Sequence, residues 1–245
     1  MLVGTADLDQ LVQTAATIDA FPVEPLNLAD VLCLQLTAEM HNQAREAVLP
    51  PSLHPTVPAI LGLQVWQVGE SPWGAFAMAV ARVACRSGVR ARGYTTAAFV
   101  STAAATEGLR SMLGFPAVQG DVTIRHSYDG TRASVDWQGA RILEVVGLDP
   151  EPLGAADVQY TGTLNLAHTP NGLRLVQVEA HHQVNRVERL TARLDTFDAS
   201  AWGNPLLDPY RVVSCSVALE EVTFAPVRFV CKPDELAFTG TEAVA

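Results

Sequence analysis

The sequence predicts a mainly β protein of the α+β class, in which an antiparallel sheet, closed or sandwiched, is flanked by a few helices. Most aliphatic residues after residue 57 fall in short runs separated by Gly, Pro, Asn and Asp, as strands joined by turns require. Only a few stretches carry apolar residues at helical spacing. With 245 residues and 49% hydrophobic content, the chain is long enough for one large core. A single domain over residues 1–245 is therefore expected.

Three helices are predicted from apolar spacing and from their start and stop signals. Residues 7–20 show helical periodicity after Asp7, a residue type that favours the N-cap position. Residues 37–49 form a second amphipathic stretch that ends at a pair of prolines. The third helix is expected over residues 102–113, with Gly114 just past its end.

The strands follow the aliphatic runs, and two turn motifs join pairs of them into hairpins. The predicted strands cover residues 30–36, 57–68, 75–84, 94–100, 120–128, 132–137, 141–146, 158–168, 173–185, 187–195 and 210–229. Asp129-Gly130 is a strong signal for a two-residue hairpin turn, and Pro170-Asn171-Gly172 marks a second one. Residues 234–245 are expected to be frayed.

Composition and charge exclude several classes of function. The net charge is −10, without the basic stripe that phosphate binding needs, so no nucleic-acid partner and no anionic membrane surface are expected. No apolar run reaches the roughly 20 residues that span a bilayer, and the first residues do not resemble a signal peptide. These features favour a cytoplasmic protein. The four cysteines are scattered without a CxxC pair, which favours buried, reduced thiols.

Lysine is almost absent from the chain. Of the 16 basic Lys and Arg residues, only Lys232 is a lysine. A Schiff base needs an amine, so this side chain and the N-terminus are the two candidates for such chemistry. Lys232 stands beside Pro233, beyond the last long predicted strand, and is expected to be a solvated surface residue.

The order of these features resembles the acetoacetate decarboxylase family over nearly the whole chain. Residues 45–53 resemble the family's helix and its proline-rich turn, and residues 73–81 resemble an inward-facing strand. Leu113-Gly-Phe-Pro-Ala-Val118 resembles the family's gly–phe–pro–lys–lys signature. The resemblance implies a cone-like antiparallel β-barrel with flanking helices, and it implies a homo-oligomer.

The departures from the family pattern concern the reacting groups. In the family, the first lysine of the signature forms the Schiff base and the second lowers its pKa, but these positions are Ala117 and Val118 here. The family's glutamate in the facing strand falls at Ala75, and its arginine for the substrate carboxylate falls near Asp30 or Val31. The resemblance therefore implies a retained scaffold without the family's route to decarboxylation.

Other residues could carry proton transfer instead. If residues 176–184 form one strand, Glu179 and His181 lie on one face and could act as a carboxylate-oriented imidazole. The alternative is a solvent-facing polar strand, with His182 as a satisfied core histidine. His168 closes another alternating run and is the third catalytic candidate, although a turn histidine is the alternative there. No three histidines or carboxylates stand at metal-binding spacing, so neither a metal nor a cofactor is expected.

A cavity that keeps its shape after losing charged side chains would suit a hydrophobic ligand. The candidate binding residues are Trp73, Ala75, Tyr94, Ala117, Val118, His126 and Tyr160. For the aromatic members, ordinary core packing is the alternative, and for His126 it is a half-exposed strand.

The leading functional hypothesis is a non-decarboxylating enzyme of specialised metabolism. Cyclisation, dehydration or isomerisation of a hydrophobic, carbonyl-rich, polyketide-like small molecule would need positioning and a proton shuttle but no covalent intermediate. Two alternatives stay open: a non-catalytic binding or carrier protein for a hydrophobic metabolite, and a degenerate structural subunit. Fold resemblance alone does not decide among them.

Overall fold

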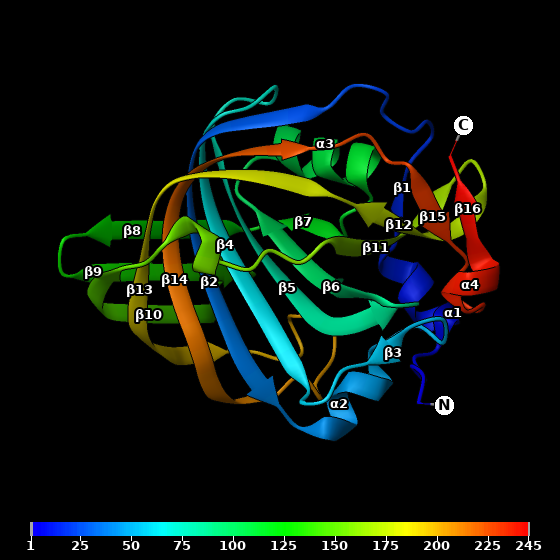
Figure 1. The fold of residues 1–245 in the computed structure, drawn as a ribbon, viewed down its shortest axis with the longest axis horizontal. Coiled ribbons are helices and arrows are strands. Elements are labelled where there is room, and N and C mark those ends of the chain that lie inside the picture. The colour runs from blue at the N-terminus through cyan, green and yellow to red at the C-terminus, as the bar shows by residue number, and fades with distance from the viewer. Residues whose placement is uncertain (1, 245) are drawn as a thin grey trace.

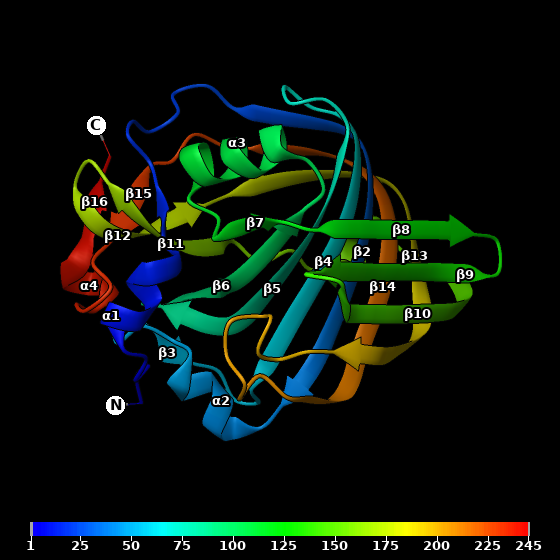
Figure 2. The same ribbon diagram turned by 180° about the vertical axis from the view of Figure 1, so that it is seen from behind.

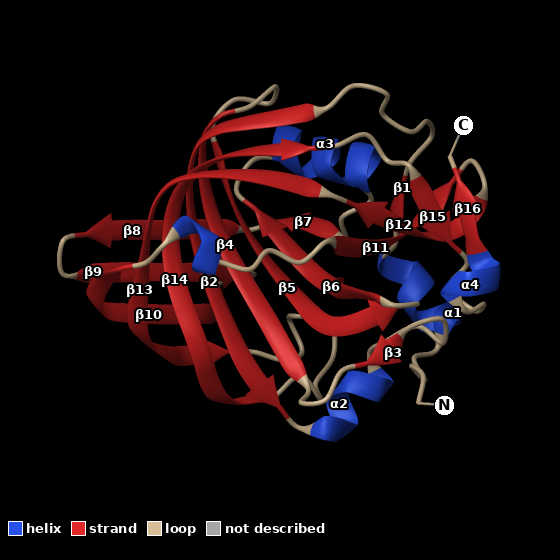
Figure 3. Cartoon of the chain, viewed as in Figure 1, coloured by secondary structure: helices blue, strands red, loops and turns tan. Residues whose placement is uncertain are grey.

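The computed structural model describes residues 2–244, and sixteen strands in this range form one sheet. The hydrogen-bonded order is β16-β15-β12-β11-β6-β5-β4-β2-β14-β13-β10-β9-β8, and β1, β3 and β7 pair with β11, β5 and β6 at the sides. Figure 1 shows the long central strands curving around the molecule, and Figure 3 shows how few helices accompany them. The prediction of a mainly β protein is confirmed.

The elements have the following bounds. The strands are β1 Ala16–Thr17, β2 Leu26–Met40, β3 His54–Pro55, β4 Ile60–Glu70, β5 Phe76–Ser87, β6 Arg90–Val100, β7 Ala117–Gln119, β8 Asp121–Ser127, β9 Gly130–Trp137, β10 Ala140–Pro152, β11 Thr163–Thr169, β12 Gly172–Val178, β13 Ala180–Phe197, β14 Pro209–Phe224, β15 Phe229–Cys231 and β16 Thr241–Ala243. The helices are α1 Leu8–Leu11, η1 Val12–Thr14, α2 Asn42–Ala47, α3 Ala103–Leu113, η2 Ala155–Asp157 and α4 Ala237–Gly240.

The sheet is mixed and open, which corrects the expected closed antiparallel barrel. The pairs β1–β11, β11–β6 and β6–β7 are parallel, and no hydrogen-bonded ladder joins the two ends of the sheet within residues 2–244. Instead, β8 packs across β4, β5 and β6, and Figure 2 shows β8, β9 and β10 lying across the back of the central strands. Side-chain packing thus holds the rolled sheet together where hydrogen bonds do not.

The central strands are buried on both faces, so their sequences read as continuous aliphatic runs. Leu34 and Leu36 of β2 belong to a first core cluster, between the central strands and β8–β10. Val31 and Cys33 point to the other face and belong to a second cluster, which α3 covers. The residues of β5 from Phe76 to Ala81 are all buried because they alternate between these two clusters.

The local signals of α3 and of the two hairpins are confirmed. Thr102 caps α3 by accepting a hydrogen bond from the Ala105 amide, and Gly114 takes the left-handed conformation at its end with φ of 69°. Strands β8 and β9 join at Asp129-Gly130 as predicted. Strands β11 and β12 form the second predicted hairpin.

Several predicted boundaries are wrong: for example, the strand expected over residues 158–168 begins only at Thr163, and the one expected over 210–229 ends at Phe224. Sheet pairing explains the four differences described next. The first helix ends at Thr14 rather than at residue 20, because Ala16 and Thr17 pair with β11. The helix expected from residue 37 begins only at Asn42, since β2 continues to Met40 between β14 and β4.

The other two corrections concern the C-terminal half. The strand expected over residues 173–185 is interrupted at Glu179, where the chain leaves β15 as a partner and turns to β14. Residues 237–243, expected to be frayed, form α4 and β16, and β16 pairs with β15. Ala245 lies outside the described residues.

All four cysteines are buried and unpaired, as predicted. Burial raises the pKa of the Cys85 thiol, and likewise that of Cys215, from 9.0 to about 12. The folded protein therefore holds two protons that the unfolded chain releases above pH 9.

Stability should for this reason fall as pH rises from 9 to 12, by about 1.4 kcal/mol per pH unit for each such thiol. Urea unfolding at several alkaline pH values measures this slope. The Cys85→Ala, Cys215→Ala double variant should show a shallower slope, and an unchanged slope would contradict the assignment to these thiols.

Candidate functional site

A fully buried carboxylate stands near the middle of the large sheet. Glu220 of β14 is 1% exposed. Its Oε2 accepts a hydrogen bond from the Tyr160 hydroxyl at 2.5 Å and lies 3.2 Å from Nδ1 of His182. Its Oε1 has no hydrogen-bond partner within residues 2–244. Burying a carboxylate with one oxygen unpaired costs folding free energy, which makes Glu220 a candidate functional residue.

Strand register and one long connection bring these three residues together. Glu220 lies opposite Val31 on β2, and His182 of β13 lies opposite Val222 on β14. Tyr160 comes from residues 153–162, here called the crossing segment, which joins β10 to β11. In Figure 1 this segment, in yellow-green, passes in front of β14, β2 and β4.

The crossing segment is fixed by hydrogen bonding and by ring stacking. The Gln35 side chain donates to the Gln159 carbonyl at 3.0 Å. The Tyr160 ring stacks on the His182 ring with a centroid separation of 3.6 Å and an interplanar angle of 8°. Tyr160 therefore sets the plane of the imidazole and at the same time donates to Glu220.

The charge states follow from this arrangement. Burial and the hydrogen bond to Glu220 raise the pKa of Tyr160, so its phenol keeps its proton. When Glu220 is ionised, its oxygen can only accept, so Nδ1 of His182 donates this hydrogen bond. In the neutral imidazole the lone pair is then on Nε2. A carboxylate-oriented imidazole of this kind is suited to act as a general base.

Cys33 of β2 is a buried thiol that is influenced by the charges of both Glu220 and Arg82. Burial, followed by the negative charge of Glu220, raises the pKa of the Cys33 thiol, and the positive charge of Arg82 opposes this rise. Cys33 thus lies under the influence of both charges. Its protonated thiol is unsuited to nucleophilic attack.

Arg82 of β5 is a half-buried cation without a protein anion. None of the ion pairs within residues 2–244 involves its guanidinium, and its Nε is enclosed without a hydrogen-bond partner. Burial lowers the pKa of Arg82 to about 10, so the group stays charged at neutral pH. An unpaired guanidinium of this kind suits the carboxylate of a ligand.

Arg82 lines a pocket of about 440 Å³, here called the Arg82 pocket. Its walls include polar side chains of the central strands, namely Gln35, Thr37, Gln64, Arg82, Arg92 and Ser216. Residues 157–159 of the crossing segment close one side. The volume lies in the range of small-molecule sites.

The structure does not bring the predicted catalytic residues together. Glu179 lies between β12 and β13 and forms an ion pair with Arg92, with N and O 2.5 Å apart. His181 is exposed on β13, and His168 is exposed near the end of β11. The continuous strand that would have paired Glu179 with His181 is therefore wrong, and their catalytic roles stay predictions without a shared site.

Two of the predicted binding residues line a cavity, and a third does not. Tyr160 forms a group with His182 and Glu220, here called the Glu220 cluster, and none of the three lines either cavity. Tyr94 and Val118 line a second cavity, of about 580 Å³. Ala117 does not share that cavity, because successive residues of β7 face opposite sides and its side chain is buried in the second core cluster.

The other predicted binding residues lie outside both cavities. Trp73 packs against Phe76 and lies on α3, where a Cβ atom at Gly108 would meet its ring at 2.1 Å. Ala75 is exposed in the turn between β4 and β5. His126 hydrogen-bonds Thr131 within the β8–β9 hairpin. These positions correct the idea of a single cavity lined by all the predicted residues.

Sequence reasoning gave no functional role to Glu220, Arg82 or His182, although each carried a signal. Glu220 stands between Ala218 and Val222 on the inward face of a strand. Arg82 is the one charge in the aliphatic run of β5 from Phe76 to Cys85. His182 was recognised as inward-facing but interpreted as a satisfied core histidine.

The single lysine, Lys232, lies at the surface and is already paired with a carboxylate. The Lys232 ammonium pairs with the Glu235 carboxylate at 2.6 Å, and its side chain is 37% exposed. This confirms the expectation of a surface lysine. Within residues 2–244, no three His, Cys, Asp or Glu side chains cluster as metal ligands. No helix in that range is both long and apolar enough to span a membrane.

Comparisons with known proteins found one matching family and several solved structures of similar fold. The family profile described as acetoacetate decarboxylase matches residues 12–224. A search of curated proteins found no match. Similar solved structures include acetoacetate decarboxylase from Legionella pneumophila, with a TM-score of 0.74 and 17% identity over 84% of this chain and 87% of that one.

Two further solved structures carry different names. An acetoacetate decarboxylase-like enzyme from Sphingomonas wittichii RW1 has a TM-score of 0.70 and 13% identity over 84% of this chain and 92% of that one. The enduracididine biosynthesis enzyme MppR, complexed with pyruvate, has a TM-score of 0.69 and 16% identity over 84% and 90%. At these identities the likeness shows the fold. The family profile covers most of the chain, and this protein therefore belongs to the acetoacetate decarboxylase family.

Proposed function

We propose that this protein is an acetoacetate decarboxylase-like enzyme that catalyses proton transfer without a covalent intermediate. Its substrate is a carbonyl-rich, largely hydrophobic acid, which it isomerises, dehydrates or cyclises. The observation that carries this proposal is the buried Glu220, which orients His182 and Tyr160 and whose charge, like that of Arg82, acts on the Cys33 thiol. Such a group can move a proton at carbon next to a carbonyl.

Each residue has a distinct part in the proposed reaction. Nε2 of His182 removes a proton from the carbon beside the carbonyl, and Glu220 stabilises the imidazolium that forms. The Tyr160 ring holds the imidazole in plane by stacking. Arg82 binds the substrate carboxylate and offsets the negative charge that develops on the enolate oxygen. In an isomerisation, the His182 imidazolium then returns the proton to a different atom of the substrate. In a dehydration, it gives the proton to the departing hydroxyl, which leaves as water.

The substrate class is supported by the pocket and by one relative. An unpaired guanidinium in a pocket of about 440 Å³ suits a small carboxylic acid. MppR has been solved with pyruvate and with the condensation product of pyruvate and imidazole 4-carboxaldehyde. A 2-oxo acid, or a larger molecule containing that group, is therefore the first class to test.

A Schiff-base route is disfavoured because the single lysine of the chain pairs with Glu235 at the surface, and because Ala117 and Val118 are predicted to stand at the family's two lysine positions. Borohydride reduction in the presence of pyruvate should therefore leave the intact mass of the protein unchanged. The Lys232→Arg variant should behave identically. An adduct that maps to Lys232, and that this variant lacks, would restore the covalent route.

The direct test measures proton exchange. Pyruvate, 2-oxobutyrate, phenylpyruvate and acetoacetate are each incubated with the protein in D₂O, and loss of the α-proton signal is followed by NMR. At least one acid should exchange faster with the protein than without it. The protein-dependent exchange rate of its methyl ester should be at least ~10-fold lower than that of the acid, because the ester has no carboxylate for Arg82 to bind. If no acid in this set is accelerated, the proposed chemistry is wrong.

The natural substrate is sought by mass spectrometry of metabolites from the native host with the gene intact and deleted. A compound that accumulates on deletion identifies the substrate. A product of the same mass supports isomerisation or cyclisation, and a product lighter by one water supports dehydration. Loss of carbon dioxide would instead point to decarboxylation and would contradict the proposal.

A further inference from the structure

The second cavity, of about 580 Å³, lies apart from the Glu220 cluster and is here called the N-terminal cavity. One wall is the N-terminal segment, residues 6–15, and the floor is β6. Residues 200–204, except buried Trp202, form a further part of the lining. Val118 lines it from β7, on the side opposite to the side chain of Ala117. The Arg82 pocket shares none of these lining residues.

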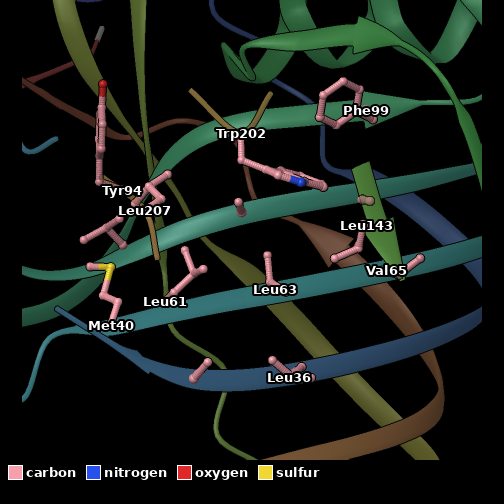
Figure 4. Packing of buried hydrophobic residues seen from close by; sticks show 14 of the residues in the cluster. Leu36, Met40, Leu61, Leu63, Val65, Tyr94, Phe99, Leu143, Trp202 and Leu207 are labelled. Carbon is pink, nitrogen blue, oxygen red and sulfur yellow. The ribbon is translucent and has the colours of Figure 1, made fainter. Parts of the chain in front are cut away.

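The apolar lining of the N-terminal cavity includes three aromatic residues beside its aliphatic ones. Tyr94, Phe99 and Trp137 line it, and the Phe99 and Trp137 rings meet edge to face with centroids 5.6 Å apart. Figure 4 shows Tyr94 and Phe99 rising from the same strand, with their rings on the side away from Leu61 and Leu63. Flat aromatic walls favour a ligand that itself carries a ring.

The cavity also holds polar groups that the protein leaves unsatisfied. Arg110 of α3 donates one hydrogen bond, to the Ala117 carbonyl at 3.0 Å, and no ion pair joins it to a carboxylate of the described range. Thr95 is 2% exposed, and its buried hydroxyl has no hydrogen-bond partner. Both residues line the same cavity, and leaving a buried hydroxyl unsatisfied is costly unless a ligand supplies an acceptor.

One carboxylate lines the same cavity and has to be considered. Asp7 is exposed, and its side chain accepts the Asp9 amide at the start of α1. That hydrogen bond engages one of its two oxygens. Since a second anion near Asp7 would be repelled, the ligand's acidic group belongs at the Arg110 end.

We propose that the N-terminal cavity is a binding site for an aryl carboxylate, separate from the catalytic pocket. The ring of the ligand packs against Phe99 and Trp137. Its carboxylate accepts hydrogen bonds from the Arg110 guanidinium and the Thr95 hydroxyl. Tyr94 and Val118, which the sequence marks as binding residues, would thus contact this ligand rather than the substrate. The inference does not depend on the proposed proton transfer.

Isothermal titration calorimetry with 2-naphthoate, 4-phenylbutyrate and neutral 2-naphthamide tests this site. The wild-type protein should bind at least one of the two acids with a Kd below ~1 mM. Arg110→Gln should weaken that acid at least ~10-fold, because a charge-assisted hydrogen bond is lost, and should change 2-naphthamide binding little. The matched control is Arg125→Gln, an exposed arginine on β8 that should leave binding unchanged.

Two further variants keep the test decisive if Arg110→Gln lowers stability. Thr95→Val preserves shape and removes the unsatisfied hydroxyl, so it should weaken the acid selectively. Val118→Trp fills the cavity from a residue that is 39% exposed, so it should abolish binding of acid and amide alike while the protein stays folded. Thermal unfolding of each variant confirms that the fold persists.

Arg82→Met distinguishes the two sites. Binding of the acid should survive this variant, whatever happens to proton exchange. If Arg82→Met abolishes binding and Arg110→Gln does not, the ligand occupies the catalytic pocket and the inference is wrong. It is equally wrong if neither acid binds below ~1 mM.

Discussion

Glu220→Gln is expected to lower the rate of α-proton exchange by ~100- to 10,000-fold, the range that general acid–base groups contribute. The amide has the same shape but cannot hold the charge that stabilises the His182 imidazolium. It can still accept the Tyr160 hydroxyl through its carbonyl oxygen. The hydrogen-bonded arrangement of the cluster should therefore survive while the base is disabled.

Stability should separate this effect from a structural one. Removing a buried charge of which one oxygen has no partner is expected to change the free energy of unfolding by less than ~2 kcal/mol, in either direction. The matched control is Glu221→Gln on the same strand, whose side chain alternates to the other face. If both variants retain full exchange activity, Glu220 is not part of the catalytic machinery.

Trp202→Ala is expected to lower the free energy of unfolding by ~3–5 kcal/mol, the usual cost of truncating a large buried aromatic side chain. The Trp202 side chain is fully buried, and its ring meets Phe99 edge to face at 4.8 Å and stacks on Phe197 at 5.9 Å. Its indole nitrogen donates to the Ile142 carbonyl at 3.2 Å. In Figure 4 Trp202 lies among Phe99, Leu63 and Leu143, where the rolled sheet is packed against itself.

The expected loss of stability is large because side-chain packing around Trp202 holds the two parts of the sheet together where no hydrogen-bonded ladder within residues 2–244 joins them. Urea unfolding followed by circular dichroism gives the free energy, and Phe238→Ala serves as control. Phe238 is 78% exposed, so its truncation should change stability by less than ~0.5 kcal/mol. Equal losses in the two variants would show that the core around Trp202 does not hold the rolled sheet together.

The sequence by itself determined the elements whose signals are local. The caps of α3 at Thr102 and Gly114 act within a few residues, and so does the turn at Asp129-Gly130, so periodicity and turn chemistry are enough to place them. The surface character of Lys232 was likewise predicted from the sequence, and the structure bears it out. That Ala117 and Val118 stand at the family's lysine positions stays a prediction from the resemblance.

Only the tertiary structure decided which polar residues share a site. Tyr160 and Glu220 are 60 residues apart, and His182 and Glu220 are 38 apart. Alternation along a strand tells which face a side chain takes, but not which strand lies beside it or which segment crosses above it. The same limit applies to Glu179, whose partner is Arg92 rather than His181 because the chain changes strands at that residue. Long-range pairing, fixed by burial on both faces of the sheet, is what assembles the Glu220 cluster.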